Sequence, residues 1–235
     1  MNILVTGASR GIGKAIAQNL KSCGNIYATA RNIEALKSLD CAVYFVCDLS
    51  KEKDLVKLGD FIAENKIDVL VNNAGEYIYG AIDTTEIHNI THIMNVNLQA
   101  PIYLTSRAVP YMKSQKFGRI VNIGSISGVM GEANASLYSA TKSGLVGFAK
   151  ATGLELAEFG ITVNTINPGW VDTELGKGSI EDSEFSQEEI IECIPQRRFV
   201  SPEEVAGLVK YLISDEAKGI TGQSINLCAG LSVGI

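Results

Sequence analysis

Asn2-Ile-Leu-Val-Thr6-Gly7-Ala-Ser-Arg-Gly11-Ile-Gly13 opens the chain and carries the strongest indication of its architecture. The first five residues read as a short buried strand, the next seven as a glycine-rich turn, and a helix is expected from Lys14 to about Leu20. Glycine permits a tight turn and a close approach of backbone to a pyrophosphate, and a helix N-terminus offers unpaired N–H groups. The order strand, glycine turn, helix therefore predicts a dinucleotide-binding site.

Apolar runs alternate with helical patterns along the rest of the chain. Buried strands that are each followed by a helix imply a parallel sheet covered on both faces. We therefore predict an α/β fold, a Rossmann-like doubly wound parallel sheet. At 235 residues the chain is too short for two typical α/β domains, so one domain over residues 1–235 is expected. The further strands are expected at 26–30, 42–46, 69–71, 120–123, 162–166 and 224–227.

Tyr138 and Lys142 stand four residues apart, and Ser125 lies thirteen residues before the tyrosine. On a helix, positions i and i+4 share a face, so an ammonium can sit beside a phenol and lower its pKa from about 10. Such a group can give and take protons, and a serine hydroxyl next to it can hold a carbonyl oxygen. The spacing alone also fits two surface neighbours, and Ser127 is an alternative to Ser125.

Bulk properties exclude several classes of function. A net charge of −6 and a pI near 5.1 give no basic surface for nucleic acid or an anionic membrane, and no apolar run approaches a membrane span. Strand 2–6 follows Met1 directly, which indicates a cytoplasmic protein without a targeting peptide. The five cysteines are odd in number and lack Cys-x-x-Cys spacing. His88 and His92 share helical spacing but have no evident third ligand, so no metal site is expected.

The end of the second expected strand indicates the choice of cofactor. An acidic residue about twenty positions after the glycine turn would bind the ribose of NAD, but Tyr27-Ala-Thr-Ala-Arg31 has no carboxylate. Arg10 and Arg31 could both bind a 2′-phosphate through paired donors. These residues favour NADP(H), and the alternative is that both arginines are ordinary solvated charges.

The chain resembles the short-chain dehydrogenase/reductase family over essentially its whole length. Its glycine spacing is similar to the single-domain oxidoreductase branch, and the nearest resemblance is to 3-oxoacyl-acyl-carrier-protein reductases. The residues that carry the resemblance follow in the family's order: Thr6 to Gly13, Asp48, Asn72-Asn-Ala-Gly75, Asn97, Ser125, Tyr138, Lys142 and Pro168-Gly169.

The resemblance implies a catalytic set of Asn97, Ser125, Tyr138 and Lys142. Asn97 would orient a water for the lysine, with Asn95 as its neighbouring alternative. Asp48 would bind the adenine amine, and it could equally cap the following helix. The resemblance implies cofactor contacts from Gly7, Ser9, Arg10, Gly11, Ile12, Gly13, Arg31, Asp48, Asn73, Ala74, Gly75, Tyr138, Lys142, Pro168, Gly169, Val171 and Thr173.

The resemblance also implies a mobile lid at about 172–195, with Gly176 and Gly178 as its hinge. The expected reaction is NADPH-linked reduction of a 3-oxoacyl thioester, linked to acyl carrier protein or CoA, by a homotetramer or homodimer. Lys116 matches one basic position for docking a carrier protein, whereas Phe159 replaces a second. The alternatives are reduction of another small ketone or polyketide-type intermediate, and a non-catalytic NADPH-sensing protein.

Overall fold

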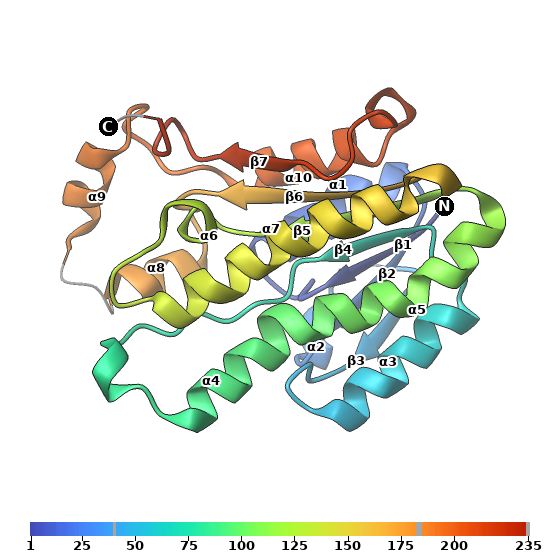
Figure 1. Ribbon diagram of the computed structural model, residues 1–235, viewed down its shortest axis with the longest axis horizontal. Coiled ribbons are helices and arrows are strands. Elements are labelled where there is room, and N and C mark those ends of the chain that lie inside the picture. The colour runs from blue at the N-terminus through green and yellow to red at the C-terminus, as the bar shows by residue number, and fades with distance from the viewer. Residues whose placement is uncertain (40, 182–184, 234–235) are drawn as a thin grey trace.

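Seven parallel strands form one sheet in the order β3-β2-β1-β4-β5-β6-β7 in the computed structural model, which describes residues 1–39, 41–181 and 185–233 (Figure 1). Helices cover both faces, as the sequence predicted for a doubly wound α/β fold. The strands are β1 Asn2–Thr6, β2 Asn25–Ala30, β3 Val43–Val46, β4 Val69–Asn72, β5 Gly118–Ile123, β6 Ile161–Pro168 and β7 Ser224–Leu227.

The α-helices follow these strands along the chain, with α1 and α10 on one face of the sheet and α3, α5 and α7 on the other. They are α1 Gly11–Asn19, α2 Ile33–Lys37, α3 Glu52–Glu64, α4 Ile87–Met94, α5 Ala100–Gln115, α6 Ser127–Met130, α7 Ser136–Leu156, α8 Glu174–Glu181, α9 Gln187–Cys193 and α10 Pro202–Leu212. Short 3₁₀ segments are η1 Leu20–Ser22, η2 Ile82–Thr84, η4 Ala157–Phe159 and η5 Asp215–Ala217, and η3 Asn95–Gln99 is a π-helical turn.

Two apolar cores form because side chains alternate between the faces of each strand. Ile3 and Val5 of β1 enter the core beneath α1 and α10, whereas Leu4 between them enters the core beneath α3, α5 and α7. All three side chains are fully buried. Burial on both faces explains why these strands read as continuous apolar runs in the sequence.

The carboxyl ends of all seven strands meet at one edge of the sheet, because every pairing is parallel. The strand order reverses between β1 and β4, which is where open α/β sheets bind ligands. In Figure 1 the arrowheads of the sheet point toward the side that carries α6, α8 and α9. The glycine turn after β1 therefore lies beside the segments that follow β4, β5 and β6.

The expected lid at 172–195 forms two helices, α8 and α9, over this edge; its residues 182–184 lie outside the described part of the chain. Gly176 and Gly178 were expected to be a hinge, but both lie inside α8. A Cβ at Gly176 would stand 2.3 Å from the Val171 carbonyl oxygen, so this glycine allows close packing of α8. No helix in the described ranges is long and apolar enough to cross a membrane.

Candidate active site

A cavity of about 1390 Å³ lies at the carboxyl edge of the sheet, between the glycine turn and α8. The catalytic candidates Ser125, Tyr138 and Lys142 line it, together with every residue predicted to contact the cofactor. Asn97 is the exception, because it is buried behind the cavity wall. The fold thus brings together groups that lie up to 166 positions apart, from Gly7 to Thr173.

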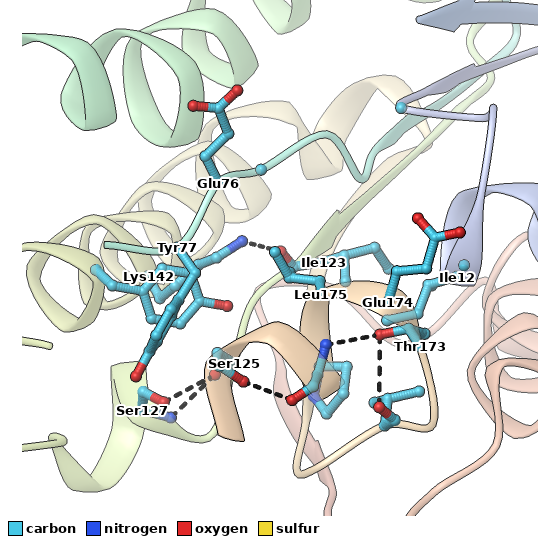
Figure 2. A pocket seen from close by; sticks show the side chains of 18 of the residues that line it. Ile12, Glu76, Tyr77, Ile123, Ser125, Ser127, Lys142, Thr173, Glu174 and Leu175 are labelled. Atoms are coloured by element: carbon cyan, nitrogen blue, oxygen red, sulfur yellow. Dashed lines mark hydrogen bonds between the residues drawn. The ribbon is translucent and has the colours of Figure 1, made fainter. Parts of the chain in front are cut away.

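Tyr138 and Lys142 lie on one face of α7, as their spacing predicted. Their exposed fractions are 9% and 4%, so they are not surface neighbours. The Lys142 Nζ donates a hydrogen bond of 2.9 Å to the Ile123 carbonyl and lies 5.4 Å from the centroid of the Tyr138 ring. Figure 2 shows this ammonium directed at Ile123, at the end of β5.

The pKa of Tyr138 corrects one expectation, that Lys142 lowers it. Burial raises the pKa of Tyr138 to about 12, the Ser125 hydroxyl offsets part of this rise, and the charge of Glu132 adds to it. Burial also lowers the pKa of Lys142 from 10.5 to about 8. Desolvation therefore outweighs the attraction between the two groups, because removal from water penalises the charged form of each.

Ser125 belongs to a directed chain of hydroxyl groups that ends at Glu132. The Ser127 hydroxyl donates to a Glu132 carboxylate oxygen at 2.6 Å, and the Tyr77 hydroxyl donates to the other oxygen at 2.7 Å. Because the Ser127 hydrogen is committed to the carboxylate, Ser127 accepts from the Ser125 hydroxyl at 3.1 Å (Figure 2). Both serines line the cavity, and of the two it is the Ser125 hydroxyl that lowers the pKa of Tyr138.

Tyr77 forms the wall of the cavity beside the tyrosine of α7. The rings of Tyr77 and Tyr138 meet edge to face, with centroids 5.0 Å apart and an interplanar angle of 71°. Burial, the hydrogen bond to Glu132 and its charge raise the pKa of Tyr77. Tyr77 is therefore a neutral hydrogen-bond donor that fixes both Glu132 and the Tyr138 ring.

Asn97 lies in the π-helical turn that joins α4 to α5 and is 1% exposed. Its Oδ1 accepts from the Glu76 amide at 2.8 Å, and its Nδ2 donates to the Glu76 carbonyl at 2.8 Å and to the Thr141 hydroxyl at 3.3 Å. The turn thus ties the segment after β4 to the helix of Tyr138. Asn95, the neighbouring alternative, is less buried at the start of the same turn.

The glycine turn has the shape and the donors that a pyrophosphate requires. Gly7 has a φ of +66°, and a Cβ at Gly13 would lie 2.3 Å from the Gly7 carbonyl oxygen, so each position requires glycine. The N-cap residue of α1, Arg10, makes no side-chain hydrogen bond to the helix within the described part of the chain. The first N–H groups of α1 are therefore available to an anion.

The segment after β4 is fixed against this turn by Thr6. The Thr6 hydroxyl oxygen accepts from the Asn73 and Ala74 amides at 3.0 Å each, and the Asn73 side chain donates to the Thr6 carbonyl at 2.8 Å. A Cβ at Gly7 would lie 2.9 Å from the Ala74 Cα. The two walls of the groove are therefore packed together without room for larger side chains, and they fit a dinucleotide.

Arg10 and Arg31, the predicted 2′-phosphate ligands, both line the cavity. Arg10 forms an ion pair of 2.7 Å with Glu174, and Arg31 forms one of 2.8 Å with Glu76. Each arginine side chain is 59% exposed, so each pairs with a carboxylate while it remains in contact with solvent. Binding of a 2′-phosphate by these arginines stays a prediction, and so does the alternative that both are ordinary solvated charges.

Asp48 also lines the cavity, but its role as a helix cap is wrong. Helix α3 begins after the N-cap Lys51, and Asp48 instead accepts from the Ser50 amide at 3.1 Å and the Ser50 hydroxyl at 2.7 Å. The aspartate thus closes the turn before the helix, because its side chain reaches the amide two residues on. Its position in the cavity remains compatible with binding an adenine.

The two histidines of α4 each pair with a glutamate. His92 Nε2 contacts a Glu76 oxygen at 2.5 Å, and His88 Nδ1 lies 3.1 Å from Glu86. Among the residues that the structure describes, no three His, Cys, Asp or Glu side chains converge as a metal site would require.

The proposed carrier-docking positions lie at the opposite edge of the sheet from the cavity. Lys116 is exposed at the end of α5, just before β5, and Phe159 precedes β6. The Phe159 ring is half-buried, with the Lys113 ammonium 4.4 Å from its centroid. Within one chain, a carrier protein bound there would not face the cavity.

Glu132, Tyr77, Glu76 and Thr141 were missed by the sequence reasoning. Glu132 lies between Ser125 and Tyr138, and Glu76 directly follows Asn72-Asn-Ala-Gly75. The available signal was an acidic residue between Ser125 and Tyr138 and another directly after Gly75. Their partners could not be read from the chain, because Tyr77 and Glu132 are 55 positions apart.

Comparison with known proteins finds close relatives over nearly the whole chain. A family model described as "Enoyl-(Acyl carrier protein) reductase" matches residues 7–232. The 3-oxoacyl-[acyl-carrier-protein] reductase FabG of Buchnera aphidicola subsp. Schizaphis graminum is 34% identical over 236 residues, covering 97% of this chain and 96% of the relative. The granaticin polyketide synthase putative ketoacyl reductase 1 of Streptomyces violaceoruber is 36% identical over 252 residues, covering 97% and 92%. A solved actinorhodin polyketide ketoreductase variant with NADPH matches with a TM-score of 0.92 and 37% identity, covering 99% of this chain and 97% of that one.

Proposed function

The chain belongs to the short-chain dehydrogenase/reductase family of oxidoreductases, and we propose that it is an NADPH-dependent ketoreductase that acts on a 3-oxoacyl thioester. One observation carries this proposal: Ser125, Tyr138 and Lys142 line the same cavity as the glycine turn, Arg10 and Arg31. A proton donor, Tyr138, and the glycine turn expected to bind the dinucleotide therefore line the same cavity, which is what reduction of a carbonyl by a bound cofactor requires.

The catalytic roles follow from the chemistry of the buried groups. NADPH, when bound, supplies the hydride. Tyr138 donates its phenolic proton to the carbonyl oxygen, and its pKa of about 12 keeps that proton in place at neutral pH. An alkoxide is a much stronger base than a phenolate, so the transfer remains downhill. Ser125 holds the same oxygen, which requires its hydrogen to turn from Ser127 toward the substrate.

Lys142 and Asn97 support the tyrosine in different ways. The Lys142 ammonium is the buried cation beside the Tyr138 ring, and it stabilises the phenolate that remains after proton transfer. Asn97 is a positioning residue, since it fixes the Glu76 backbone and bonds Thr141, whose hydroxyl donates to the Tyr138 carbonyl at 2.8 Å.

The choice of NADPH is supported by Arg10 and Arg31 in the cavity and by the absence of a carboxylate in Tyr27-Ala-Thr-Ala-Arg31. The actinorhodin polyketide ketoreductase variant, 37% identical, was solved with NADPH. The thioester substrate is supported by the FabG relative, whereas the granaticin relative favours a polyketide-type ketone as the second candidate. The half-buried Glu132 among the catalytic hydroxyls also favours a substrate with polar groups near its carbonyl.

Association into a homodimer or homotetramer is proposed as well. Large apolar side chains are exposed on α4, α5 and α7, among them Ile87 at 77%, Ile102 at 40% and Leu154 at 83%. A contact between copies would also be needed for a carrier protein bound at Lys116 to face a cavity. These side chains are the surface that such a contact would cover.

The substrate proposal is tested by measuring NADPH oxidation with a panel of compounds. The panel contains acetoacetyl-CoA, a carrier-linked 3-oxoacyl chain, a polyketide-like diketone, simple hydroxyketones and crotonyl-CoA. We expect the highest kcat/KM with a 3-oxoacyl thioester. Reduction of crotonyl-CoA alone would instead indicate an enoyl reductase, and tight NADPH binding without turnover of any compound would indicate an NADPH sensor.

A further inference from the structure

Both arginines that face the cofactor groove are engaged by carboxylates of the same chain. Arg31 contacts Glu76 at 2.8 Å, and Arg10 contacts Glu174 at 2.7 Å. All four residues line the cavity. The carboxylate in each pair occupies guanidinium N–H donors that a phosphate would also use.

The pair formed by Arg31 and Glu76 spans the groove. Arg31 directly follows β2, and Glu76 comes four residues after β4. Because β1 lies between these strands, the ion pair crosses the end of β1, where the glycine turn begins at Gly7. A 2′-phosphate in the groove and the Glu76 carboxylate would therefore compete for the same guanidinium donors of Arg31.

Glu76 is held firmly on its own side of the groove. Its second carboxylate oxygen lies 2.5 Å from His92 Nε2, and its side chain is only 28% exposed. Its backbone amide and carbonyl are both bonded to the Asn97 side chain. Since these backbone bonds do not involve the carboxylate, a change of the side chain at this position would leave them in place.

Glu174 approaches the groove from the other direction. It is the first residue of α8, and the preceding Thr173 lies against the glycine turn, where a Cβ at Gly11 would be 3.2 Å from the Thr173 Cγ2. Figure 2 shows Glu174 beside Ile12, across the cavity from Glu76. The two carboxylates thus reach the arginines from opposite walls.

We propose that Glu76 and Glu174 limit the preference for NADPH over NADH, because they are internal counter-ions that the 2′-phosphate of NADPH must displace from Arg31 and Arg10. This inference rests on the proposed use of NADP(H). The two carboxylates lower the affinity for NADPH but not for NADH, which has no 2′-phosphate. They therefore reduce the preference that the arginines alone would give.

The expected effect of each carboxylate follows from the exposure of its ion pair. Partly exposed pairs of this kind change an equilibrium by a factor of about two to five. Removing the carboxylate also removes its repulsion of the phosphate, which acts in the same direction. We therefore expect Glu76→Gln and Glu174→Gln each to tighten NADPH binding by about three- to fivefold, and the double variant by about tenfold or more.

Isothermal titration calorimetry on the full chain tests this without any turnover. Dissociation constants are measured for NADPH, NADH, 2′,5′-ADP and 5′-ADP with the wild type, Glu76→Gln, Glu174→Gln and the double variant. Glu86→Gln is the matched control, because Glu86 pairs with His88 and does not line the cavity. Unchanged melting temperatures verify that each variant is folded, and Glu174→Gln alone suffices if Glu76→Gln fails to fold.

The inference predicts tighter binding of NADPH and 2′,5′-ADP in the variants, with NADH, 5′-ADP and the control within twofold of the wild type. It is overturned if NADPH binding does not change, or if NADH and 5′-ADP tighten equally. A wild type that binds NADPH and reduces ketones while the variants bind it unchanged refutes only this inference. A wild type that binds neither NADPH nor 2′,5′-ADP refutes the proposed function as well.

Discussion

Replacing Lys142 with methionine should make the stability of the protein less dependent on pH. Lys142 is 4% exposed, and burial lowers its pKa from 10.5 to about 8. The folded state therefore binds this proton less tightly than the unfolded state does. The resulting destabilisation is fully present below about pH 8 and is lost as the pH rises toward 10.5.

The magnitude follows from the pKa difference. At about 1.4 kcal/mol per pKa unit, the fall from 10.5 to about 8 corresponds to about 3 kcal/mol near neutral pH. Because proton release from the unfolded chain is incomplete at pH 10, most of this, about 2–3 kcal/mol, should disappear between pH 7 and pH 10. The contacts of the uncharged lysine and of the new methionine do not vary with pH, so they cancel from this change.

Urea unfolding followed by the fluorescence of Trp170, the single tryptophan, measures the effect. The free energy of unfolding of Lys142→Met minus that of the wild type should fall by about 2–3 kcal/mol from pH 7 to pH 10. Lys150→Met is the control, since Lys150 is an exposed lysine on the same helix. A difference that stays constant or grows with pH would refute a desolvated Lys142.

Four further substitutions test other parts of the structure. Gly13→Ala would set a Cβ 2.3 Å from the Gly7 carbonyl oxygen. We therefore expect at least a tenfold loss of NADPH affinity in a binding titration and a free energy of unfolding lower by about 1–3 kcal/mol. Unchanged binding would contradict the tight turn. Glu132→Gln keeps an acceptor for Ser127 but removes a charge that, together with burial, raises the pKa of Tyr138. The rate of alcohol oxidation, which rises with pH as Tyr138 loses its proton, should therefore begin to rise at lower pH; a rise at higher pH would be inconsistent. Gly176→Ala should lower the melting temperature, because its Cβ would stand 2.3 Å from the Val171 carbonyl oxygen. Gly178→Ala should not, because no atom of the described residues beyond its own helix lies within 4 Å of its Cβ.

Local patterns account for what the sequence could predict. The strand, glycine turn and helix at the start of the chain are encoded by adjacent residues, and the structure has β1 at Asn2–Thr6 and α1 at Gly11–Asn19. The shared face of Tyr138 and Lys142 also needs only helical spacing. Strand ends were less certain, and β6 extends to Pro168 where the prediction stopped at 166, because pairing with β7 continues to that residue.

Burial and long-range contacts account for what the sequence could not predict. The pKa of Tyr138 is raised where a lowered value was expected, since desolvation depends on how α7 packs and not on the spacing of two residues. The bond between Tyr77 and Glu132 depends on the sheet bringing two distant segments together. Gly176 and Gly178 were expected to form a hinge, but both lie within helix α8.

The effect of Tyr138→Phe on turnover tests the central claim most directly. The substitution removes the phenolic oxygen and leaves the ring that packs on Tyr77, so the fold and NADPH affinity should be kept. With acetoacetyl-CoA as substrate, general acid catalysis of about 10²–10⁴-fold should be lost from kcat, while the dissociation constant of NADPH changes little. A variant that still oxidises NADPH at the wild-type rate would contradict the assignment of Tyr138 as the proton donor.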